Sequence, residues 1–347
     1  MPASEVRDLS LPSMGLGTWS FGGGAYWGAQ SQADVDRVVG RAIELGLTYF
    51  DTAEMYNAGA SETALGLALC GGRRDRVLIG SKLSPANAAP AVLREHCEAS
   101  LRRLQTDRID LYMMHWPIHA DSVRHFTQDE SVIADPPSTR DAFLTLAALQ
   151  REGKIRHIGV SNFGVKQLGE VLALGVTLAV NELPYNLLMR AIEAEILSFC
   201  RARGIGVIGY MTLMQGVLAG DFASFDELPP IRTRTRHFSS RRVGSRHGEA
   251  GFETETMAAL QAIRALARER ELPLPDLALA WSLANPGIDC VLAGCRNLEQ
   301  LEENTRARDL KLDAVTLNRL NSVTEDLRQK LGSNPDFYQG RAHTRIW

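Results

Sequence analysis

The stretch LTYFDTAEMY, residues 47–56, joins a short apolar run to an aspartate and, five positions later, to a tyrosine. The run has the aliphatic and aromatic content of a strand that is buried in a sheet. A strand that ends at Asp51 and continues as a loop to Tyr56 would place a carboxylate and a phenol at the same end of that sheet. The fold therefore depends on whether other strands bring polar side chains to this end.

Short aliphatic runs alternate with stretches of helical period along the chain, which is typical of repeated strand and helix units. Eight strands are predicted, at residues 14–19, 47–51, 76–81, 109–114, 155–160, 177–180, 206–211 and 289–293. Eight such units in 347 residues favour an α/β fold of the (β/α)8 TIM barrel type, with residues 1–347 forming one domain. An open, doubly wound sheet is the alternative that the same pattern allows.

Helices are predicted between the strands by the spacing of apolar residues. The first opens at Ser31, with a capping box to Asp34, and closes at Gly46. The other predicted helices lie near residues 61–70, 93–104, 143–150, 164–174, 190–203, 254–270, 275–284, 297–306 and 313–330. Two long loops, about 116–138 and 215–252, and a tail, 331–347, are expected at the C-terminal face of the barrel, where they would shape a substrate pocket.

The composition excludes some classes of partner. Lys and Arg number 38 against 41 for Asp and Glu, so a net charge of -3 gives no long-range attraction to nucleic acid or to an anionic membrane. Five scattered cysteines without a CxxC pair suggest a reducing, cytoplasmic setting. Residues 1–12 show no signal peptide, and no run approaches the length of a membrane span. The oligomeric state is not indicated.

The chemistry of a barrel collects at the C-terminal ends of its strands, so the first polar residues after each apolar run are the candidate site. Each has an ordinary alternative: an aspartate can cap a turn, a lysine can be solvated, a histidine can lie satisfied in a core, and a tyrosine can sit exposed in a loop. Their occurrence at corresponding positions favours a site. These residues are Asp51, Lys82, His115, Ser161, Asn162, Glu182, Tyr210 and Arg296.

Four of the side chains can act together as an acid and base device. Tyr56 is a weak acid at neutral pH, with an ordinary pKa of about 10, unless a cation lies close to it. Lys82 can supply that cation and Asp51 can hold the lysine in place, while a neutral His115 can hydrogen-bond a substrate oxygen. Such a set would protonate a carbonyl oxygen as it becomes an alkoxide, or remove the proton in the reverse direction.

Three motifs, FDTAEMY, GSKL and MMHWP, resemble the Asp, Tyr, Lys and His tetrad of the aldo-keto reductase superfamily. The resemblance extends from MGLGTW near residue 14 to CRNLEQLEENTRA near residue 307. It implies a (β/α)8 barrel and hydride transfer from a nicotinamide dinucleotide. It also implies that Tyr56 is the general acid, that Lys82 and Asp51 tune it, and that His115 orients the carbonyl.

The same resemblance implies a cofactor site. It places Ser161 and Asn162 at the nicotinamide carboxamide and Tyr210 under the nicotinamide ring. The complete set of implied cofactor contacts is Thr18, Trp19, Asp51, Ser161, Asn162, Glu182, Tyr210, Met211, Leu213, Gln215, Gly294, Arg296, Gln300, Glu303 and Asn304.

Two residues depart from the family pattern. Glu182 stands where the family usually has Gln, and an ionised Glu cannot donate to the carboxamide oxygen, so either the group is protonated or the carboxamide is held differently. Gly294 and Gln300 occupy positions where some members carry basic residues. NADP(H) is favoured because Arg296 offers a fork of donors to a 2'-phosphate, and NAD(H) is the alternative.

The expected function is NADP(H)-dependent reduction of aldehydes, ketones or sugar-like carbonyls. The alternatives are a sugar or polyol dehydrogenase that runs in reverse and a non-catalytic nucleotide-binding regulatory subunit. The six arginines of residues 232–246 could recognise an acidic substrate or cover the cofactor, but a mobile, solvated loop is the favoured reading. No metal is expected, because His119, Asp121 and His125 show no coordination pattern. The residues available to line the pocket are Trp19, Tyr26, Trp27, 115–125, 232–246, Phe337, Tyr338 and Trp347.

Overall fold

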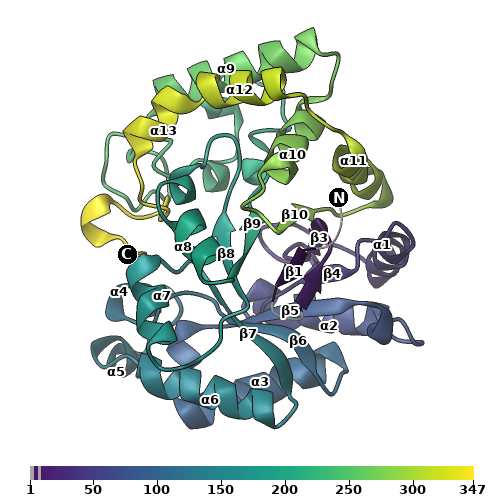
Figure 1. Cartoon of the computed structure of the whole chain (residues 1–347), viewed down its shortest axis with the longest axis vertical. Coiled ribbons are helices and arrows are strands. Elements are labelled where there is room, and N and C mark those ends of the chain that lie inside the picture. Colours follow the sequence, from purple (N-terminus) through teal and green to yellow (C-terminus); the bar gives the residue numbers. More distant parts are fainter. Residues whose placement is uncertain (1–3, 7–8) are drawn as a thin grey trace.

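A computed structural model describes residues 4–6 and 9–347, and it contains a closed barrel of eight parallel strands (Figure 1). The strands follow one another in chain order around the barrel, and the last pairs with the first. This confirms the predicted TIM barrel. The barrel strands are β3 (Met14–Gly17), β4 (Tyr49–Asp51), β5 (Leu78–Leu83), β6 (Ile109–Met114), β7 (Ile155–Ser161), β8 (Val180–Pro184), β9 (Gly206–Tyr210) and β10 (Cys290–Gly294).

The prediction was wrong about the extent of two strands. The sixth was placed at residues 177–180, but β8 runs from Val180 to Pro184 and pairs Glu182 with Ile208 of β9. The third was ended at residue 81, but β5 continues through Lys82 to Leu83. The strand ends were predicted too early because a polar residue interrupts each apolar run in the sequence. In the barrel, Lys82 and Glu182 are buried and the strands continue past them.

A ring of helices surrounds the barrel (Figure 1). The first shows why they form: the Ser31 hydroxyl accepts from the backbone N–H of Asp34, Val35, Val38 and the other apolar residues of one face are buried, and Gly46 has a φ of 78° just after the end. The helices of the ring are α1 (Gln32–Glu44), α2 (Ala60–Ala68), α3 (Pro90–Leu104), α6 (Thr139–Arg151), α7 (Val165–Leu172), α8 (Ile196–Ala202), α10 (Leu274–Ala284) and α11 (Leu298–Asp309).

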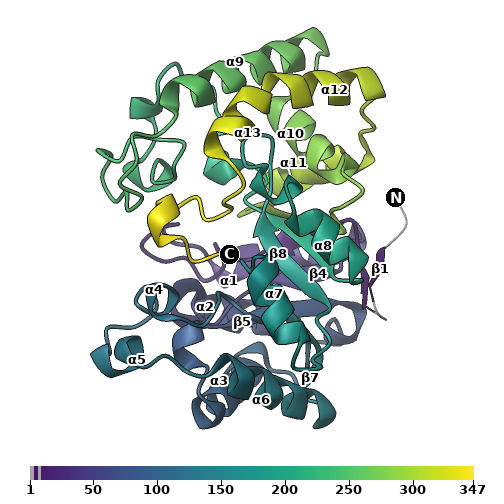
Figure 2. The same cartoon turned by 60° about the vertical axis from the view of Figure 1, so that its left-hand side comes forward.

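A hairpin that the sequence did not predict lies at the N-terminal end of the barrel. Strand β1 (Ser4–Val6) pairs antiparallel with β2 (Leu9–Leu11). Leu9 and Leu11 are buried in a cluster with Tyr49, Leu111 and other residues inside the barrel. Figure 2 shows β1 on the side of the barrel opposite to the C-terminal tail. The hairpin therefore closes one end, and the other end is left to the loops and the tail.

The two long loops contain short helices. The loop after β6 includes α4 (Ala120–Val123) and α5 (Glu130–Ala134). The loop after β9 includes η5 (Met214–Gly216), η6 (Phe225–Glu227) and η7 (Pro230–Arg232), and it leads into α9 (Glu253–Glu269), which packs against α12 (Ala314–Val323) and α13 (Glu325–Leu331). The remaining short helices are η1 (Tyr56–Gly59), η2 (Arg74–Arg76), η3 (Pro85–Asn87), η4 (Ala191–Glu193) and η8 (Arg341–His343).

Two predicted helices are divided. Residues 313–330 form α12 and α13, which meet at Thr324, and the Thr324 hydroxyl donates to the carbonyl of Leu320. Residues 190–203 form η4 and then α8. In the first case a threonine hydroxyl competes with the helical pattern, which the apolar spacing alone does not reveal.

The reading of residues 232–246 as a mobile, solvated loop is wrong for Arg236. This side chain is fully buried, and its guanidinium donates to the carbonyls of Leu331, at 3.1 Å, and Asn334, at 2.8 Å. The segment is therefore packed against the start of the tail. A count of arginines could not reveal this, because the carbonyls that hold Arg236 lie about a hundred residues further along the chain.

The tail is fixed at the mouth of the barrel by a buried ion pair. Both carboxylate oxygens of Asp336 accept from the guanidinium of Arg345, each at 2.8 Å, and the two residues are 0% and 3% exposed. The Arg345 guanidinium lies 3.6 Å from the ring centre of Trp116, next to His115. The carbonyl of Arg345 also accepts from Gln167 of α7. The tail, the loop after β6 and α7 are therefore connected.

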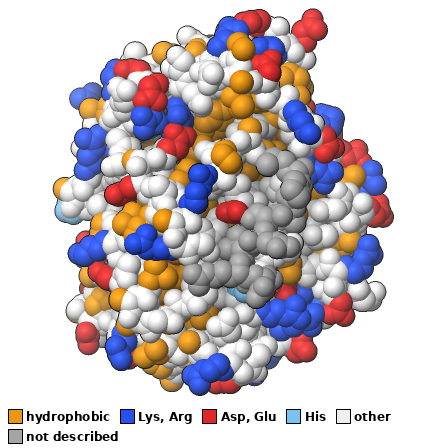
Figure 3. Space-filling view, viewed as in Figure 1, with side chains coloured by type: hydrophobic (Ala, Val, Ile, Leu, Met, Phe, Trp, Pro, Cys, Tyr) orange, Lys and Arg blue, Asp and Glu red, His pale blue; other side chains and the backbone are white. Residues whose placement is uncertain are grey.

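The surface carries charges of both signs. On the face drawn in Figure 3, basic and acidic side chains are interspersed, in keeping with the small net charge. Among the helices that the structure describes, none combines the length and hydropathy needed to cross a bilayer. The five cysteines are free, and Cys70 is the exposed one.

We expect Asp336→Asn to lower the free energy of unfolding by about 3 kcal/mol, because it leaves the charge of Arg345 buried without its counter-ion. Urea unfolding of the purified chain measures this. Glu269→Gln removes an exposed partner of Arg319 and serves as the control, with little expected change in the midpoint. Equal midpoints for the two variants would show that the buried pair does not hold the tail.

Candidate active site

The ammonium of Lys82 is the centre of a buried polar cluster at the C-terminal ends of the strands. Lys82 Nζ donates to both carboxylate oxygens of Asp51, at 2.7 and 2.6 Å, and to the carbonyl of Thr52, at 3.0 Å. It also lies 3.3 Å from the hydroxyl oxygen of Tyr56. Lys82 is 0% exposed and Asp51 is 2% exposed. Three of the predicted catalytic residues are thus in direct contact.

Glu182 is a second carboxyl at the same ammonium. Its Oε1 lies 3.4 Å from Lys82 Nζ, and its Oε2 is buried without a hydrogen-bond partner among the described residues. Asp51 contacts the ammonium with both oxygens at shorter distances. The electrostatic advantage of ionisation is therefore larger for Asp51 than for Glu182.

The protonation states follow from these contacts. Burial, and then the negative charge of Asp51, raise the pKa of Glu182 well above its ordinary value, and Lys82 opposes this shift. Although burial acts to lower the pKa of Lys82, the carboxylate of Asp51 outweighs it and raises that pKa, so the ammonium stays charged. We infer a charged Lys82, an ionised Asp51 and a neutral Glu182. A neutral Glu182 resolves the first departure from the family pattern, because a carboxylic acid can both donate and accept, as an amide does.

Tyr56 differs from the sequence-based expectation. Its ring is half-buried, and burial raises the pKa of its hydroxyl above the ordinary value, while the charge of Lys82 opposes that shift. Lys82 acts to make Tyr56 a stronger acid, as the sequence predicts. Burial has a larger effect on the pKa of Tyr56, in the opposite direction, which the prediction omitted. Tyr56 therefore holds its proton throughout the neutral range.

His115 lies next to Tyr56 and is uncharged. Their ring centres are 5.9 Å apart in an edge-to-face arrangement. Burial, and then the charge of Lys82, lower the pKa of His115 well below its ordinary value. The backbone N–H of His115 donates to the carbonyl of Leu83, and Nδ1 has no partner among the described residues. A neutral imidazole beside the phenol is available to an incoming oxygen atom.

Glu54, within the same motif, holds the loop that carries Tyr56. Its Oε1 accepts from the backbone N–H of Ser84, at 2.8 Å, and from the amide of Asn87, and its Oε2 lies 2.7 Å from Nδ1 of His96. The sequence did not assign this residue a role. Its position between Asp51 and Tyr56 was the only signal.

The predicted nicotinamide contacts come together beside this cluster. The Tyr210 hydroxyl donates to Oδ1 of Asn162 at 2.7 Å, and the Asn162 amide donates to Oγ of Ser161 and to the carbonyl of His115. Asn162 has a φ of 64°, in the left-handed region that asparagine adopts more readily than other non-glycine residues. These bonds fix the half-buried ring of Tyr210 at the mouth, with one face available for stacking.

Backbone in the left-handed region continues after β9. Met211, Met214 and Gln215 have φ values of 55°, 47° and 53°, and residues in this conformation cluster at ligand-binding segments. Leu213 lies in the same turn. Thr18, another predicted cofactor contact, has a structural role. Its buried hydroxyl donates to the carbonyl of Asp51, at 2.8 Å, and so connects the ends of β3 and β4.

The predicted adenosine contacts lie at the start of α11. Gln300 accepts from the backbone N–H of Arg296, at 2.9 Å, and Asn304 donates to the carbonyl of Gly294, at 3.0 Å, so both amides hold this turn together. The Arg296 guanidinium donates to the carbonyl of Ala29, and its Nε is buried without a hydrogen-bond partner in the part of the chain that the structure describes. Glu303 is exposed on α11 and lies 4.0 Å from Arg306.

Aromatic rings line the mouth on the other side of Tyr56. Trp19 lies 6.1 Å from Tyr56 and 4.7 Å from Tyr26, measured between ring centres, and Trp27 contacts both Trp19 and Tyr26. Phe126, just beyond the predicted lining segment 115–125, lies 5.9 Å from His115.

The histidines considered as metal ligands have other neighbours. His119 Nε2 lies 3.1 Å from the carbonyl of Arg345, and His125 contacts Arg246 and Gln339. Within residues 4–6 and 9–347, no group of three or more His, Cys, Asp or Glu side chains could hold a metal ion.

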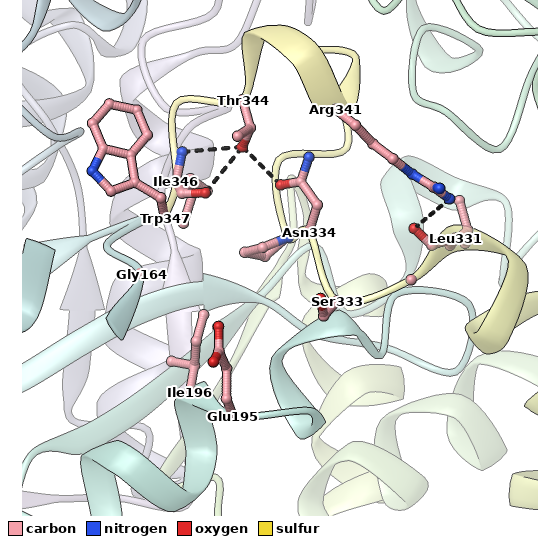
Figure 4. A pocket seen from close by; sticks show the side chains of 12 residues that line it. Gly164, Glu195, Ile196, Leu331, Ser333, Asn334, Arg341, Thr344, Ile346 and Trp347 are labelled. Atoms are coloured by element: carbon pink, nitrogen blue, oxygen red, sulfur yellow. Dashed lines mark hydrogen bonds between the residues drawn. The ribbon is translucent and has the colours of Figure 1, made fainter. Parts of the chain in front are cut away.

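A cavity of about 350 Å³ lies under the tail (Figure 4). Asn334 and Thr344, two of the residues that line it, are joined by a hydrogen bond of 2.8 Å. The lining includes Gly164, two residues after Asn162, but none of the four predicted catalytic residues. The cavity therefore lies where the tail is anchored and not at the catalytic residues. Sequence analysis missed the anchor residues Asp336 and Arg345, because only the fold brings this pair to Trp116.

Comparisons with known proteins agree on one family. Residues 13–325 match the model of the family described as "Aldo/keto reductase family". The chain is similar to the NADH-specific methylglyoxal reductase of Escherichia coli (strain K12), with 31% identity covering 93% of this chain and 98% of that protein. It is also similar to the aldo-keto reductase YhdN of Bacillus subtilis (strain 168), with 30% identity covering 94% of each.

Solved structures show the same barrel. One is an aldo/keto reductase from Klebsiella pneumoniae in complex with NADP and acetate, with 27% identity, a TM-score of 0.67, and coverage of 92% of this chain and 93% of that one. Another is a glycerol dehydrogenase from Gluconobacter oxydans, with 25% identity, a TM-score of 0.72 and coverage of 95% of each chain.

A pH-dependent stability difference tests the neutral state of Glu182. The folded chain keeps the proton of Glu182 at pH values at which the unfolded chain has released it. The stability that this protonated group contributes is therefore complete below a pH of about 4.3, and it is lost as the pH rises through the pKa of Glu182 in the folded chain. Glu182→Gln is neutral at every pH. We expect the free energy of unfolding of Glu182→Gln, relative to that of wild type, to increase by up to about 1.4 kcal/mol for each pH unit above about 4.3. Urea unfolding at about pH 5, 7 and 9 measures this difference.

The exposed Glu303→Gln is the control for this comparison, with a difference from wild type that does not change with pH. A constant difference between wild type and Glu182→Gln across the same range would mean that Glu182 is ionised in the folded chain.

Proposed function

This chain belongs to the aldo/keto reductase family, and we propose that it reduces an aldehyde, ketone or sugar-like carbonyl with NADPH, using Tyr56 as the general acid. The bound nicotinamide supplies a hydride to the carbonyl carbon. The oxygen takes the phenolic proton of Tyr56, so that one hydride and one proton convert the carbonyl to an alcohol. The observation that carries this proposal is the contact of Lys82 Nζ with both the Asp51 carboxylate and the Tyr56 hydroxyl.

Each residue of the set has a separate task. Lys82 stabilises the phenolate that remains on Tyr56 after proton transfer, and Asp51 fixes the position of the ammonium. Neutral His115 can donate a hydrogen bond to the carbonyl oxygen without adding a second positive charge next to Lys82. Loops 116–138 and 215–252 and the tail 331–347 surround this point as parts of one barrel domain and shape the substrate pocket.

The raised pKa of Tyr56 gives the two directions of the reaction different pH dependences. A developing alkoxide is more basic than a phenolate, so a protonated Tyr56 can give up its proton to it in the reduction. Oxidation of an alcohol needs a Tyr56 that has already lost its proton, and burial makes this form rare at neutral pH. A sugar or polyol dehydrogenase that uses the same residues is the second candidate, because a solved relative is a glycerol dehydrogenase.

The residues at the cofactor positions fit a nicotinamide dinucleotide. Tyr210 would stack on the nicotinamide ring, and Ser161, Asn162 and a neutral Glu182 would bind its carboxamide. The free Nε of Arg296 would meet the 2'-phosphate. NADPH is preferred on this ground, and one solved relative contains NADP. NADH is the alternative, since one similar protein is an NADH-specific methylglyoxal reductase.

Methylglyoxal is the first substrate to test, because a similar protein is named as its reductase. We propose a small aldehyde or ketone of this kind as the substrate class and the cytoplasm as the setting.

We expect Tyr56→Phe to lower kcat/KM for methylglyoxal by about 10²- to 10⁴-fold, because the substitution removes the transferable proton and keeps the ring. NADPH binding, followed by the fluorescence of the cofactor, should persist. Comparable turnover in the variant and the wild type would remove Tyr56 as the acid. NADPH binding without turnover of any carbonyl or alcohol by the wild type would favour the regulatory subunit instead.

The protonation state of Tyr56 gives kcat/KM a different pH dependence in each direction of the reaction. Between about pH 7 and 9, kcat/KM for oxidation of an alcohol should rise by close to tenfold per pH unit, because it follows the fraction of ionised Tyr56. Reduction should not rise, since Tyr56 stays protonated. Steady-state rates in both directions with one aldehyde and alcohol pair measure this, and pH-independent oxidation would contradict the raised pKa.

A further inference from the structure

Three arginines meet around Tyr338 at the mouth of the barrel. We call Arg234, Arg246 and Arg345 the arginine cluster. The guanidinium of Arg234 lies 5.8 Å from the ring centre of Tyr338. Burial raises the pKa of Tyr338 to about 12, and the charges of all three arginines act against that shift. Tyr338 in turn places its hydroxyl 3.6 Å from Sδ of Met211, in the segment that follows β9.

Two of the three charges are not neutralised. Arg345 forms the buried pair with Asp336. Within the described part of the chain, neither Arg234 nor Arg246 has a carboxylate within 4.0 Å. Arg234 donates to the carbonyl of Ile231, and Arg246 donates to Nδ1 of His125. Burial, and then the charges of Arg345 and Arg234, lower the pKa of Arg246. Positive charges are thus held close together in a chain whose net charge is -3.

His125 adds no negative charge to the cluster. Its Nδ1 lies 2.8 Å from a guanidinium nitrogen of Arg246, and burial, followed by the charges of Arg246 and Arg345, lowers the pKa of His125 to about 4. It is therefore neutral at pH 7 and can accept from Arg246 through Nδ1, and its Nε2 lies 2.9 Å from the side-chain amide of Gln339. These contacts orient Arg246 and leave the rest of its guanidinium available.

The cluster borders the reacting groups on both sides. On one side His125 precedes Phe126, whose ring lies 5.9 Å from His115. On the other side burial raises the pKa of Tyr26, and the charges of Arg232 and then of Arg234 oppose that shift. Tyr26 packs on Trp19 next to Tyr56. The Tyr26 hydroxyl is buried without a hydrogen-bond partner among the described residues. A ligand with its carbonyl at Tyr56 would therefore extend between these rings toward the arginines.

Arg232 also acts on Tyr26, but it is not counted in the cluster because its guanidinium lies against the segment that follows β9. Its guanidinium nitrogen would be 3.0 Å from a Cβ at Gly216, which places it against the turn with Leu213 and Gln215 that is predicted to line the pyrophosphate. One arginine is thus in position for the cofactor. The position of Arg234 and Arg246 around Tyr338 favours an anion on the substrate instead.

We propose that Arg234 and Arg246 form a subsite for the carboxylate or phosphate of an anionic carbonyl substrate. The inference rests on the proposed reductase function and narrows its substrate class. Guanidinium groups bind both anions through paired, charge-assisted hydrogen bonds, so the two share one chemistry here. The negative group stands at the end of the substrate remote from the carbonyl, between the rings of Tyr26 and Tyr338.

The test compares three aldehydes of similar shape with NADPH: 4-carboxybenzaldehyde, 4-formylphenyl phosphate and the neutral 4-formylbenzamide. We expect wild-type kcat/KM to be at least about tenfold higher for one or both anionic aldehydes than for the amide. Arg234→Gln and Arg246→Gln should each reduce this ratio by about tenfold. The ratio that falls most identifies carboxylate or phosphate as the preferred anion.

Arg241→Gln is the matched control, because Arg241 is exposed in the same segment and should leave the ratio unchanged. Equal wild-type kcat/KM values for anionic and neutral aldehydes would overturn the subsite while the reductase function stands. A weaker Kd for NADPH in Arg234→Gln or Arg246→Gln, with equal losses for all three aldehydes, would assign the arginines to the cofactor and also overturn it. Failure of the wild type to reduce any of the three, or methylglyoxal, would remove the proposed function and this inference with it.

Discussion

The contact of a fully buried ammonium with two carboxyls and a phenol is the interaction on which the site depends. Lys82 cannot be charged in the interior of a barrel without a counter-ion, and Asp51 supplies one with both oxygens. A second ionised carboxyl at Glu182 would cancel the effect of the lysine on Tyr56. The neutral state of Glu182 leaves one negative and one positive charge, so that Lys82 can stabilise a phenolate when the proton leaves.

The barrel makes this arrangement possible by fixing backbone positions. Asp51, Lys82 and Glu182 each lie in a strand whose neighbours are hydrogen-bonded on both sides, and the hairpin packs against apolar residues at the opposite end. The side chains therefore meet inside the barrel. Tyr56 and His115 come from the loops just beyond the strands, where the chain is free to present them to a ligand.

Much of this could be predicted from the sequence. Asp51, Lys82 and His115 each follow a short apolar run, so their meeting at one end follows from parallel strands. Tyr56 followed from its position five residues after Asp51, and the family motifs implied its role as the general acid. The strand containing Glu182 was placed three residues too early, because its polar residues look like the end of a strand until the interior partners are known. The docking of Arg236 on the tail joins segments about a hundred residues apart, which leaves no local pattern. The Asp336–Arg345 pair and the N-terminal hairpin join residues less than ten positions apart, but they pack against Trp116 and the barrel interior, respectively, and those contacts come from the fold.

The distribution of protons over Lys82, Asp51 and Glu182 is the central claim, and infrared difference spectroscopy at neutral pH tests it most directly. The wild type should show the carbonyl stretch of a neutral carboxylic acid, and this band should be missing in Glu182→Gln and disappear from the wild type as the pH is raised. A wild-type spectrum at pH 7 with only carboxylate bands from these residues would contradict the account.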